Sequence, residues 1–191
     1  LFYNTSNGLS AFGTFDTGGN FTQLRVLSFS TGWSHIVKTP TGVFFYNKTT
    51  GLAAFGKFST TGGFTQLKTF PVSPTGFAAG WTHIINTANG VYLYRATDGL
   101  GAFGRFDASG NWTLIKILSG FSSGWSLITN TKNGVFFYKS TGLAAFGTFD
   151  VNGNFTQLKT FPVSPTGFAP NWTSIINTPT GVFLYRASDG L

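Results

Sequence analysis

Short apolar runs separated by turn residues recur along the whole chain. In one stretch the runs are GWTHIINT (80–87), VYLYR (91–95), LGAFGRF (100–106) and WTLIKIL (112–118), separated by ANG, TDG and DASGN. Runs of this length, rich in β-branched and aromatic residues and bounded by Asn-Gly, Asp-Gly or Ser-Gly, are typical of β-hairpins. No stretch has the spacing of an amphipathic helix. The pattern therefore predicts modules of four short antiparallel strands.

The modules repeat with an alternating period. The dipeptide Gly-Leu begins at Gly8, Gly51, Gly99, Gly142 and Gly190, at spacings of 43, 48, 43 and 48 residues, and the longer modules contain FPVSPTGFA. The underlying repeat is thus a 91-residue pair, and 51–100 matches 142–191 at 38 of 50 positions. Four strands every 40 to 50 residues or so is the period of a propeller blade. We therefore predict an all-β fold, a β-propeller of four-stranded antiparallel blades, with four modules in two double-blade repeats.

The repeat also predicts the domain boundaries. Residues 1–191 form a single propeller domain or a propeller segment. The modules run approximately over 8–50, 51–98, 99–141 and 142–189, with 1–7 and 190–191 as partial modules. The opening LFYNTSNGL is similar to the closing FLYRASDGL. Two interpretations remain open: a slice of a longer array, or a four-module ring with one overlapping strand.

Composition excludes several functional classes. There is no Cys, which rules out disulfides and thiolate sites, and the five acidic residues are all Asp. No apolar run approaches the roughly 20 residues of a membrane helix, and the first residues have no signal-peptide pattern. The net charge of +7 is spread along the chain. Neither a clustered basic stripe nor a nucleic-acid-binding module is present, so we predict no nucleic-acid partner.

Carboxylate and metal chemistry have little support. All five Asp lie in turns: Asp16, Asp98, Asp107, Asp150 and Asp189. A turn Asp typically hydrogen-bonds to its own backbone, whereas a glycosidase needs two convergent carboxyl groups. The turn STTGG (59–63) has neither Asp nor Asn, so a calcium loop would be missing from one module. We predict no catalytic residue, no metal site and no cofactor.

Two histidines occupy one repeat position. His35 and His83 each follow the module Trp by two residues, where other modules have Leu127 and Ser174. A zinc site or a catalytic triad would need partners that the sequence does not supply. The imidazoles are therefore either blade-edge groups hydrogen-bonded to backbone or water, or ligand contacts.

The module tryptophans and the turn asparagines are the other candidate ligand contacts. The tryptophans are Trp33, Trp81, Trp125 and Trp172, and the asparagines that close D-x-x-G-N turns are Asn20, Asn111 and Asn154. An exposed indole can stack on a pyranose, and an amide can donate to and accept from sugar hydroxyl or acetamido groups. Alternatively, each Trp anchors the innermost strand and each Asn serves only the turn.

Cations also recur at fixed positions. Arg25, Lys68, Lys116 and Lys159 share one outer-strand position, and Arg95 and Arg186 share another. The favoured interpretation is protection of exposed edge strands from aggregation. Attraction to anionic glycans or to a cell surface is the alternative.

The modules resemble those of tachylectin-type β-propeller lectins. The matching residues are Gly-Trp at 32–33, 80–81 and 124–125, the strand sequences LYR (93–95) and FFY (44–46, 136–138), and Asn-Trp or Asn-Phe at 111–112, 20–21 and 154–155. The resemblance covers essentially the whole chain. It implies a multivalent binder of N-acetylated sugars, with shallow sites between or at the edges of neighbouring blades.

From this resemblance we expect a non-enzymatic lectin, secreted or at the cell surface, with repeated weak sites that act by avidity. Its partners would be glycans or glycoconjugates, and a homo-oligomer or longer array would add valency. The expected ligand-binding residues are the four module tryptophans, His35, His83 and the three turn asparagines. The alternative function is a non-catalytic structural or protein-binding scaffold, part of a longer adhesin or filament.

Overall fold

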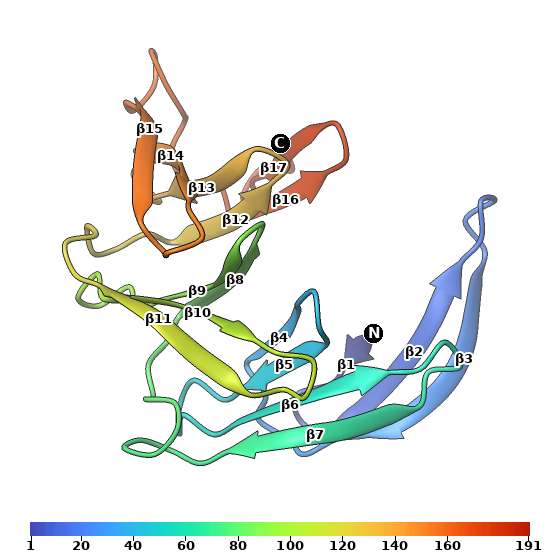
Figure 1. Ribbon diagram of the computed structural model, residues 1–191. Helices are drawn as coiled ribbons and strands as arrows, with labels where there is room; N and C mark the ends of the chain where they lie inside the picture. Colours follow the sequence, from blue (N-terminus) through green and yellow to red (C-terminus); the bar gives the residue numbers. More distant parts are fainter. The chain divides into compact units, whose positions relative to one another are not determined.

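The computed structural model describes residues 1–191 and contains 17 β-strands and no helix (Figure 1). Three sheets have four strands each. The first consists of β4 (His35–Lys38), β5 (Val43–Tyr46), β6 (Ala53–Phe58) and β7 (Phe64–Phe70), and the second of β8 (His83–Thr87), β9 (Gly90–Tyr94), β10 (Gly101–Phe106) and β11 (Trp112–Leu118). The third consists of β12 (Leu127–Thr131), β13 (Gly134–Tyr138), β14 (Ala144–Phe149) and β15 (Phe155–Phe161). Two partial sheets are β1 (Phe2–Tyr3), β2 (Leu9–Phe15) and β3 (Phe21–Ser28), and β16 (Ser174–Thr178) with β17 (Gly181–Tyr185). The predicted four-stranded antiparallel blades are confirmed.

Each complete sheet keeps its strands in chain order, and the repeated Gly-Leu lies between its second and third strands. Gly51, between β5 and β6, has φ of 86°, a conformation that favours glycine. A Cβ at this position would also collide with the carbonyl oxygen of Phe77. The repeated Gly-Leu therefore marks a turn that needs glycine. Because this turn precedes the third strand of each sheet, a module counted from Gly-Leu begins two strands later than the sheet does.

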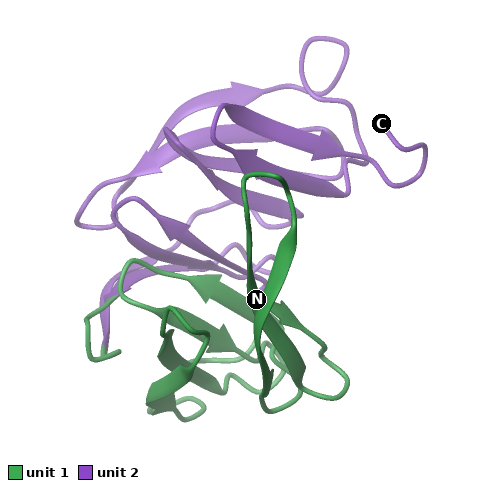
Figure 2. Ribbon diagram, turned by 90° about the vertical axis from the view of Figure 1, so that its right-hand side faces the viewer, with its two compact units in different colours: residues 1–80, 106–111 green, residues 81–105, 112–191 purple.

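The chain divides into two compact units (Figure 2). Unit 1 consists of residues 1–80 and 106–111, and unit 2 of residues 81–105 and 112–191. No helix in the structure is long and apolar enough to cross a membrane.

The core of each unit is built on the second strand of its blades. Phe44, Phe45 and Tyr46 of β5 are at most 1% exposed, and the residues of β9 from Val91 to Tyr94 are equally buried. A strand buried on both faces needs a continuous apolar run, which explains the consecutive aromatic residues. The fourth strands β3, β7 and β15 are mostly exposed, so polar side chains on them reach solvent.

A tyrosine at the end of β1, β5, β9 and β13 holds the linker that leads into the next sheet. Tyr94 donates its hydroxyl hydrogen to the carbonyl of Ser122 (2.8 Å) and accepts the backbone N–H of Trp125 (3.3 Å). The same pair of bonds recurs at Tyr3 with Ser30 and Trp33, and at Tyr138 with Ala169 and Trp172. These bonds hold the linker segments that line the pockets described below.

Candidate functional site

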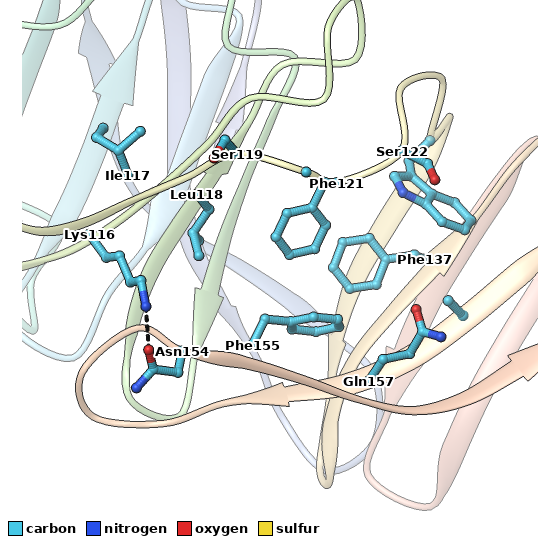
Figure 3. Close-up of a pocket in the computed structure, with 13 residues that line it drawn as sticks. Lys116, Ile117, Leu118, Ser119, Phe121, Ser122, Phe137, Asn154, Phe155 and Gln157 are labelled. Carbon is cyan, nitrogen blue, oxygen red and sulfur yellow. Dashed lines mark hydrogen bonds between the residues drawn. The ribbon is translucent and has the colours of Figure 1, made fainter.

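Unit 2 contains a cavity of about 470 Å³ (Figure 3). Its wall starts at the end of β11, follows the linker to Trp125, and includes residues of β13, β14 and β15. The lining residues include Lys116, Ser119, Phe121, Ser122, Trp125, Phe137, Asn154, Phe155 and Gln157. The volume lies within the range of small-molecule sites, about 300 to 1,000 Å³.

The inner part of the pocket is aromatic. Phe121 lies 5.0 Å from Phe155 and 5.8 Å from Phe137 between ring centroids, and Phe137 lies 5.4 Å from Phe155. The Trp125 ring is 5.7 Å from Phe137. Trp125 and Phe137 are buried, whereas Phe121 and Phe155 are half-buried. Figure 3 shows the three phenyl rings gathered at the centre of the pocket, so two partly open rings are available to a ligand.

The rim of the pocket is polar. Lys116, on β11, donates a hydrogen bond from Nζ to Oδ1 of Asn154, drawn as a dashed line in Figure 3. Asn154 Nδ2 donates in turn to Oδ2 of Asp150 at 2.8 Å. Donation from the Asn154 side chain and backbone lowers the pKa of Asp150, and the charge of Lys116 adds to this effect. The rim therefore holds a cation whose charge is partly offset by a nearby carboxylate that stays ionised in mildly acidic solution.

This arrangement favours one kind of chemistry. An ammonium group at the edge of an apolar cavity can stabilise negative charge that develops on a substrate oxygen. No Asp or His lines the cavity, so its lining side chains provide no carboxylate or imidazole as a general base. The residues are suited to polarising a carbonyl group. They do not form a glycosidase carboxylate pair.

The structure places the candidate tryptophans inside the fold. Trp33, Trp81 and Trp125 are 8, 6 and 7% exposed, and Trp172 is half-buried. Cations lie over three of the rings: Arg95 over Trp81, Lys139 over Trp125 and Arg186 over Trp172, at 5.7, 5.0 and 5.2 Å from the ring centroids. Trp33 and Trp125 nevertheless line cavities. Buried indoles do not offer the exposed stacking faces that the lectin interpretation required.

The histidines lie away from the pocket. His35 on β4 and His83 on β8 are half-buried, and each Nδ1 lies 3.0 Å from the hydroxyl of the preceding Ser34 or Thr82. His83 Nε2 also lies 3.0 Å from the carbonyl oxygen of Ser126. No group of three His or Asp side chains in residues 1–191 is placed to hold a metal ion.

The turn asparagines all bind the Asp that opens their turn. The bonds join Asn20 to Asp16 (2.9 Å), Asn111 to Asp107 and Asn154 to Asp150 (both 2.8 Å). Asn111 also accepts a hydrogen bond from Lys68 at 3.1 Å, as Asn154 does from Lys116. Of the four cations that share the outer-strand position, Lys68 and Lys116 thus donate a hydrogen bond to the turn asparagine of the next module. Of the three asparagines, Asn154 alone lines the pocket of Figure 3.

Sequence reasoning missed the ring cluster and the role of Lys116. Phe121 and Phe155 lie in different modules, and local periodicity gives no sign that they meet. One signal was present: a Phe occurs in each short linker, in LSFS (27–30) and in LSGFSS (118–123). An apolar residue repeated in an otherwise small and polar linker indicates contact with the next module.

Comparison with solved structures shows a similar fold in several bacterial proteins. A protein from Lactobacillus plantarum matches with a TM-score of 0.59 at 21% identity over 85% of this chain. A protein from Bacteroides fragilis, provisionally named a 6-phosphogluconolactonase, matches with 0.57 at 16% over 95%. The periplasmic gluconolactonase of Pseudomonas aeruginosa matches with 0.53 at 14% over 96%. The chain has the β-propeller fold.

The chain spans 50%, 58% and 74% of the length of these three proteins, respectively. No protein-family model matches the sequence, and no curated protein matches it. The resemblance to tachylectin-type repeats therefore stays a prediction.

The comparisons overturn the prediction of a non-enzymatic lectin, and with it the non-catalytic scaffold. The similar proteins with a named activity are lactonases, which are enzymes. The position of every carboxylate in a turn excludes only reactions that need a carboxylate pair. A lactone is a reactive ester, and a positioned cation can promote its hydrolysis by stabilising the developing oxyanion.

Proposed function

We propose that this chain binds a sugar lactone in the unit 2 pocket and promotes its hydrolysis to the hydroxy acid. The observation that carries the proposal is the combination, in one cavity, of half-buried aromatic rings with the ammonium group of Lys116 at the rim. The named activities of the B. fragilis and P. aeruginosa proteins add support at the level of the fold.

The aromatic rings provide the binding surface. A lactone ring has an apolar C–H face, and Phe121 and Phe155 are the two rings of the cluster that are only partly buried. Stacking there would remove apolar surface from water and leave the ring hydroxyls toward the polar rim. Ser119, Ser122 and Gln157 supply hydrogen-bonding groups around it.

Lys116 provides the electrophilic group. In hydrolysis, the oxygen of water bonds to the carbonyl carbon and negative charge develops on the carbonyl oxygen. The bond from that carbon to the ring oxygen then breaks, the ring oxygen takes a proton, and the acid releases one. An ammonium hydrogen bond to the carbonyl oxygen stabilises the intermediate more than the ground state, which lowers the barrier. Asn154 positions Nζ of Lys116 through its hydrogen bond.

We further propose that the chain acts outside the cytoplasm, in a secreted or cell-surface setting. The periplasmic gluconolactonase of P. aeruginosa, which shares the fold, supports an extracytoplasmic compartment.

A pH-stat assay tests the activity, because each turnover releases one proton. We expect glucono-δ-lactone to be hydrolysed above the rate without protein, with saturation by substrate. Lys116→Met should lower kcat by about 100- to 1,000-fold, since one oxyanion-stabilising group is lost. Lys159→Met is the matched control, because Lys159 has the equivalent position on β15 and does not line the cavity.

The outcome that would overturn the proposal is equally definite. If the wild-type protein gives only the uncatalysed rate, or if Lys116→Met and Lys159→Met lower kcat equally, the unit 2 pocket is not a lactonase site.

A further inference from the structure

Unit 1 contains a second pocket that corresponds to the first through the repeat. Its volume is about 330 Å³, and it is lined by Leu27, Ser28, Phe29, Ser30, Trp33, Phe45, Ala54, Phe64 and Gln66. The ring cluster is reproduced: Phe29 lies 5.0 Å from Phe64 and 5.2 Å from Phe45 between centroids, and Phe45 lies 5.3 Å from Phe64. The two pockets therefore offer a ligand the same aromatic surface.

The two pockets differ in the turn that lies beside the cation of the neighbouring outer strand, which is Lys116 in unit 2 and Arg25 in unit 1. Arg25, on β3, has the position of Lys116, two residues before a pocket-lining Leu, so its side chain lies on the same side of its strand as Leu27. Lys116 lines the unit 2 pocket, whereas Arg25 lies just beyond the residues that line the unit 1 pocket. The turn beside Lys116 contains Asp150 and Asn154. The turn beside Arg25 is STTGG, with Ser59 and Gly63 at the corresponding positions.

The guanidinium of Arg25 lies against this turn, which has the same length as the others, and no residue of the turn hydrogen-bonds to it. A Cβ added to Gly63 would lie 3.3 Å from Nη1 of Arg25, which shows how close the group is. Ser59 uses its hydroxyl for the turn, accepting the Gly63 N–H at 2.9 Å. Arg25 belongs to neither ion pair of the structure and makes no side-chain hydrogen bond in it.

Charge therefore distinguishes the two rims. At the unit 2 rim, Asp150 lies close enough to Lys116 for the lysine charge to lower its pKa, so the two charges partly cancel. At the unit 1 rim the turn has no carboxylate, and the positive charge of Arg25 is not offset by it. An arginine fork also matches the geometry of phosphate oxygens, which it can bind through two parallel hydrogen bonds.

We propose that the unit 1 pocket binds a phosphorylated sugar, with the sugar on Phe29 and Phe64 and the phosphate on Arg25. The inference deepens the proposed function, because it takes the aromatic pocket as a sugar-sized site, but it concerns binding and requires no turnover. A protein that binds phosphorylated sugars and fails to hydrolyse lactones would support it while contradicting the proposed activity.

Calorimetric titration of the intact chain with glucose 6-phosphate and with glucose tests this assignment. We expect the phosphorylated sugar to bind at least tenfold more tightly at low salt, as one charge-assisted bidentate contact allows, and salt to reduce the difference. Arg25→Gln should abolish the preference. Lys68→Gln is the matched control, because Lys68 occupies the same repeat position in unit 1 and donates to Asn111.

A second variant supplies the missing turn residues. Ser59→Asp combined with Gly63→Asn installs the Asp-Asn pair of the other turns beside Arg25. The added Cβ at Gly63 would meet only the ends of flexible side chains, Ser59 Oγ at 3.2 Å and Arg25 Nη1, so the fold should accept it. We expect this variant to bind glucose 6-phosphate about tenfold more weakly and glucose unchanged.

Three results would overturn the inference. These are equal affinity of the wild-type protein for the two sugars, loss of the preference in Lys68→Gln to the same extent as in Arg25→Gln, and binding of inorganic phosphate alone as tight as that of the phosphorylated sugar. The last would show that the aromatic pocket contributes nothing.

Discussion

Tyr94 hydrogen-bonds to the backbone N–H of Trp125, 31 residues later in the chain, at 3.3 Å, and to the carbonyl of Ser122 at 2.8 Å. The hydroxyl thereby satisfies two backbone groups of the linker that lines the unit 2 pocket. Tyr94→Phe should lower the free energy of unfolding by about 1 to 3 kcal/mol, because the Trp125 N–H loses its partner in a buried setting and the Ser122 carbonyl loses its partner in a half-buried one. Urea denaturation followed by tryptophan fluorescence measures the change.

Tyr92 provides the control, since it is on the same strand and fully buried but its hydroxyl has no hydrogen-bond partner. Burial raises the pKa of this hydroxyl, which therefore stays neutral. The corresponding residues of other modules are Phe44, Phe136 and Phe183. Tyr92→Phe should leave stability unchanged or raise it. Equal destabilisation by both substitutions would contradict the role assigned to the Tyr94 bonds.

Gly147 on β14 allows Phe155 to lie against the strand. A Cβ at Gly147 would collide with Cζ of Phe155 and come within 2.5 Å of the carbonyl oxygen of Thr156. Gly147→Ala should therefore cost about 1 to 3 kcal/mol and displace the Phe155 ring. Thermal unfolding measures the cost. Gly181→Ala, where an added Cβ has no neighbour within 4 Å, should change the melting temperature little; a drop as large as for Gly147→Ala would refute the steric explanation.

Phe155 is expected to contribute to substrate binding through its half-buried face. Phe155→Ala should raise KM for glucono-δ-lactone about tenfold and change kcat much less, because stacking stabilises ground state and transition state alike. Initial-rate kinetics separate the two parameters. Phe64→Ala removes the corresponding ring of unit 1 and controls for the loss of stability. An equal rise of KM in both variants would contradict the assignment of the lactone to unit 2.

The lowered pKa values of the five aspartates predict how the stability of the fold depends on pH. Hydrogen bonds from the turn asparagines lower the pKa of Asp16, Asp107 and Asp150, and arginine partners lower that of Asp98 and Asp189. A carboxyl group with a lowered folded-state pKa stabilises the fold above its unfolded pKa, about 3.9, and loses this effect as pH falls through the folded value. The melting temperature should be nearly constant from about pH 7 to 5 and fall below about pH 4.

Asp150→Asn should reduce the acid-dependent part of that decrease, because one of the contributing groups no longer titrates. Melting curves of the two proteins between pH 7 and pH 2.5 make the comparison. A wild-type protein whose stability rises steadily as pH falls below 4 would contradict this account of the turns.

Much of the fold could be predicted from the sequence because its determinants are local. The run at 112–118 is β11 in full, and the run at 100–106 differs from β10 by one residue. The start of the first strand of that blade was predicted less accurately, because the apolar run begins at residue 80 whereas β8 begins at His83. Gly80 has φ of 90°, which places it outside an extended strand, and the apolar pattern does not reveal this conformation.

The site was harder to predict because its residues meet only through packing between modules. The sequence indicated that Trp125 and Asn154 recur at fixed positions, with contact to a sugar, or packing for Trp125 and a turn role for Asn154, as the alternatives. In the structure Trp125 is buried in the wall of the pocket, and Asn154 accepts a hydrogen bond from Lys116. Periodicity along one module shows which face is apolar, whereas the pairing of Lys116 with Asn154 joins a strand residue to a turn residue 38 positions later in the chain.

The central claim is that the aromatic pocket of unit 2 holds a lactone with its carbonyl group at Lys116. A crystal structure with a stable lactam analogue of glucono-δ-lactone tests it most directly. We predict the analogue in the cavity of Figure 3, its ring against Phe121 and Phe155 and its carbonyl oxygen within hydrogen-bond distance of Nζ of Lys116. An analogue bound elsewhere on the chain, or bound with its carbonyl directed away from Lys116, would contradict the account.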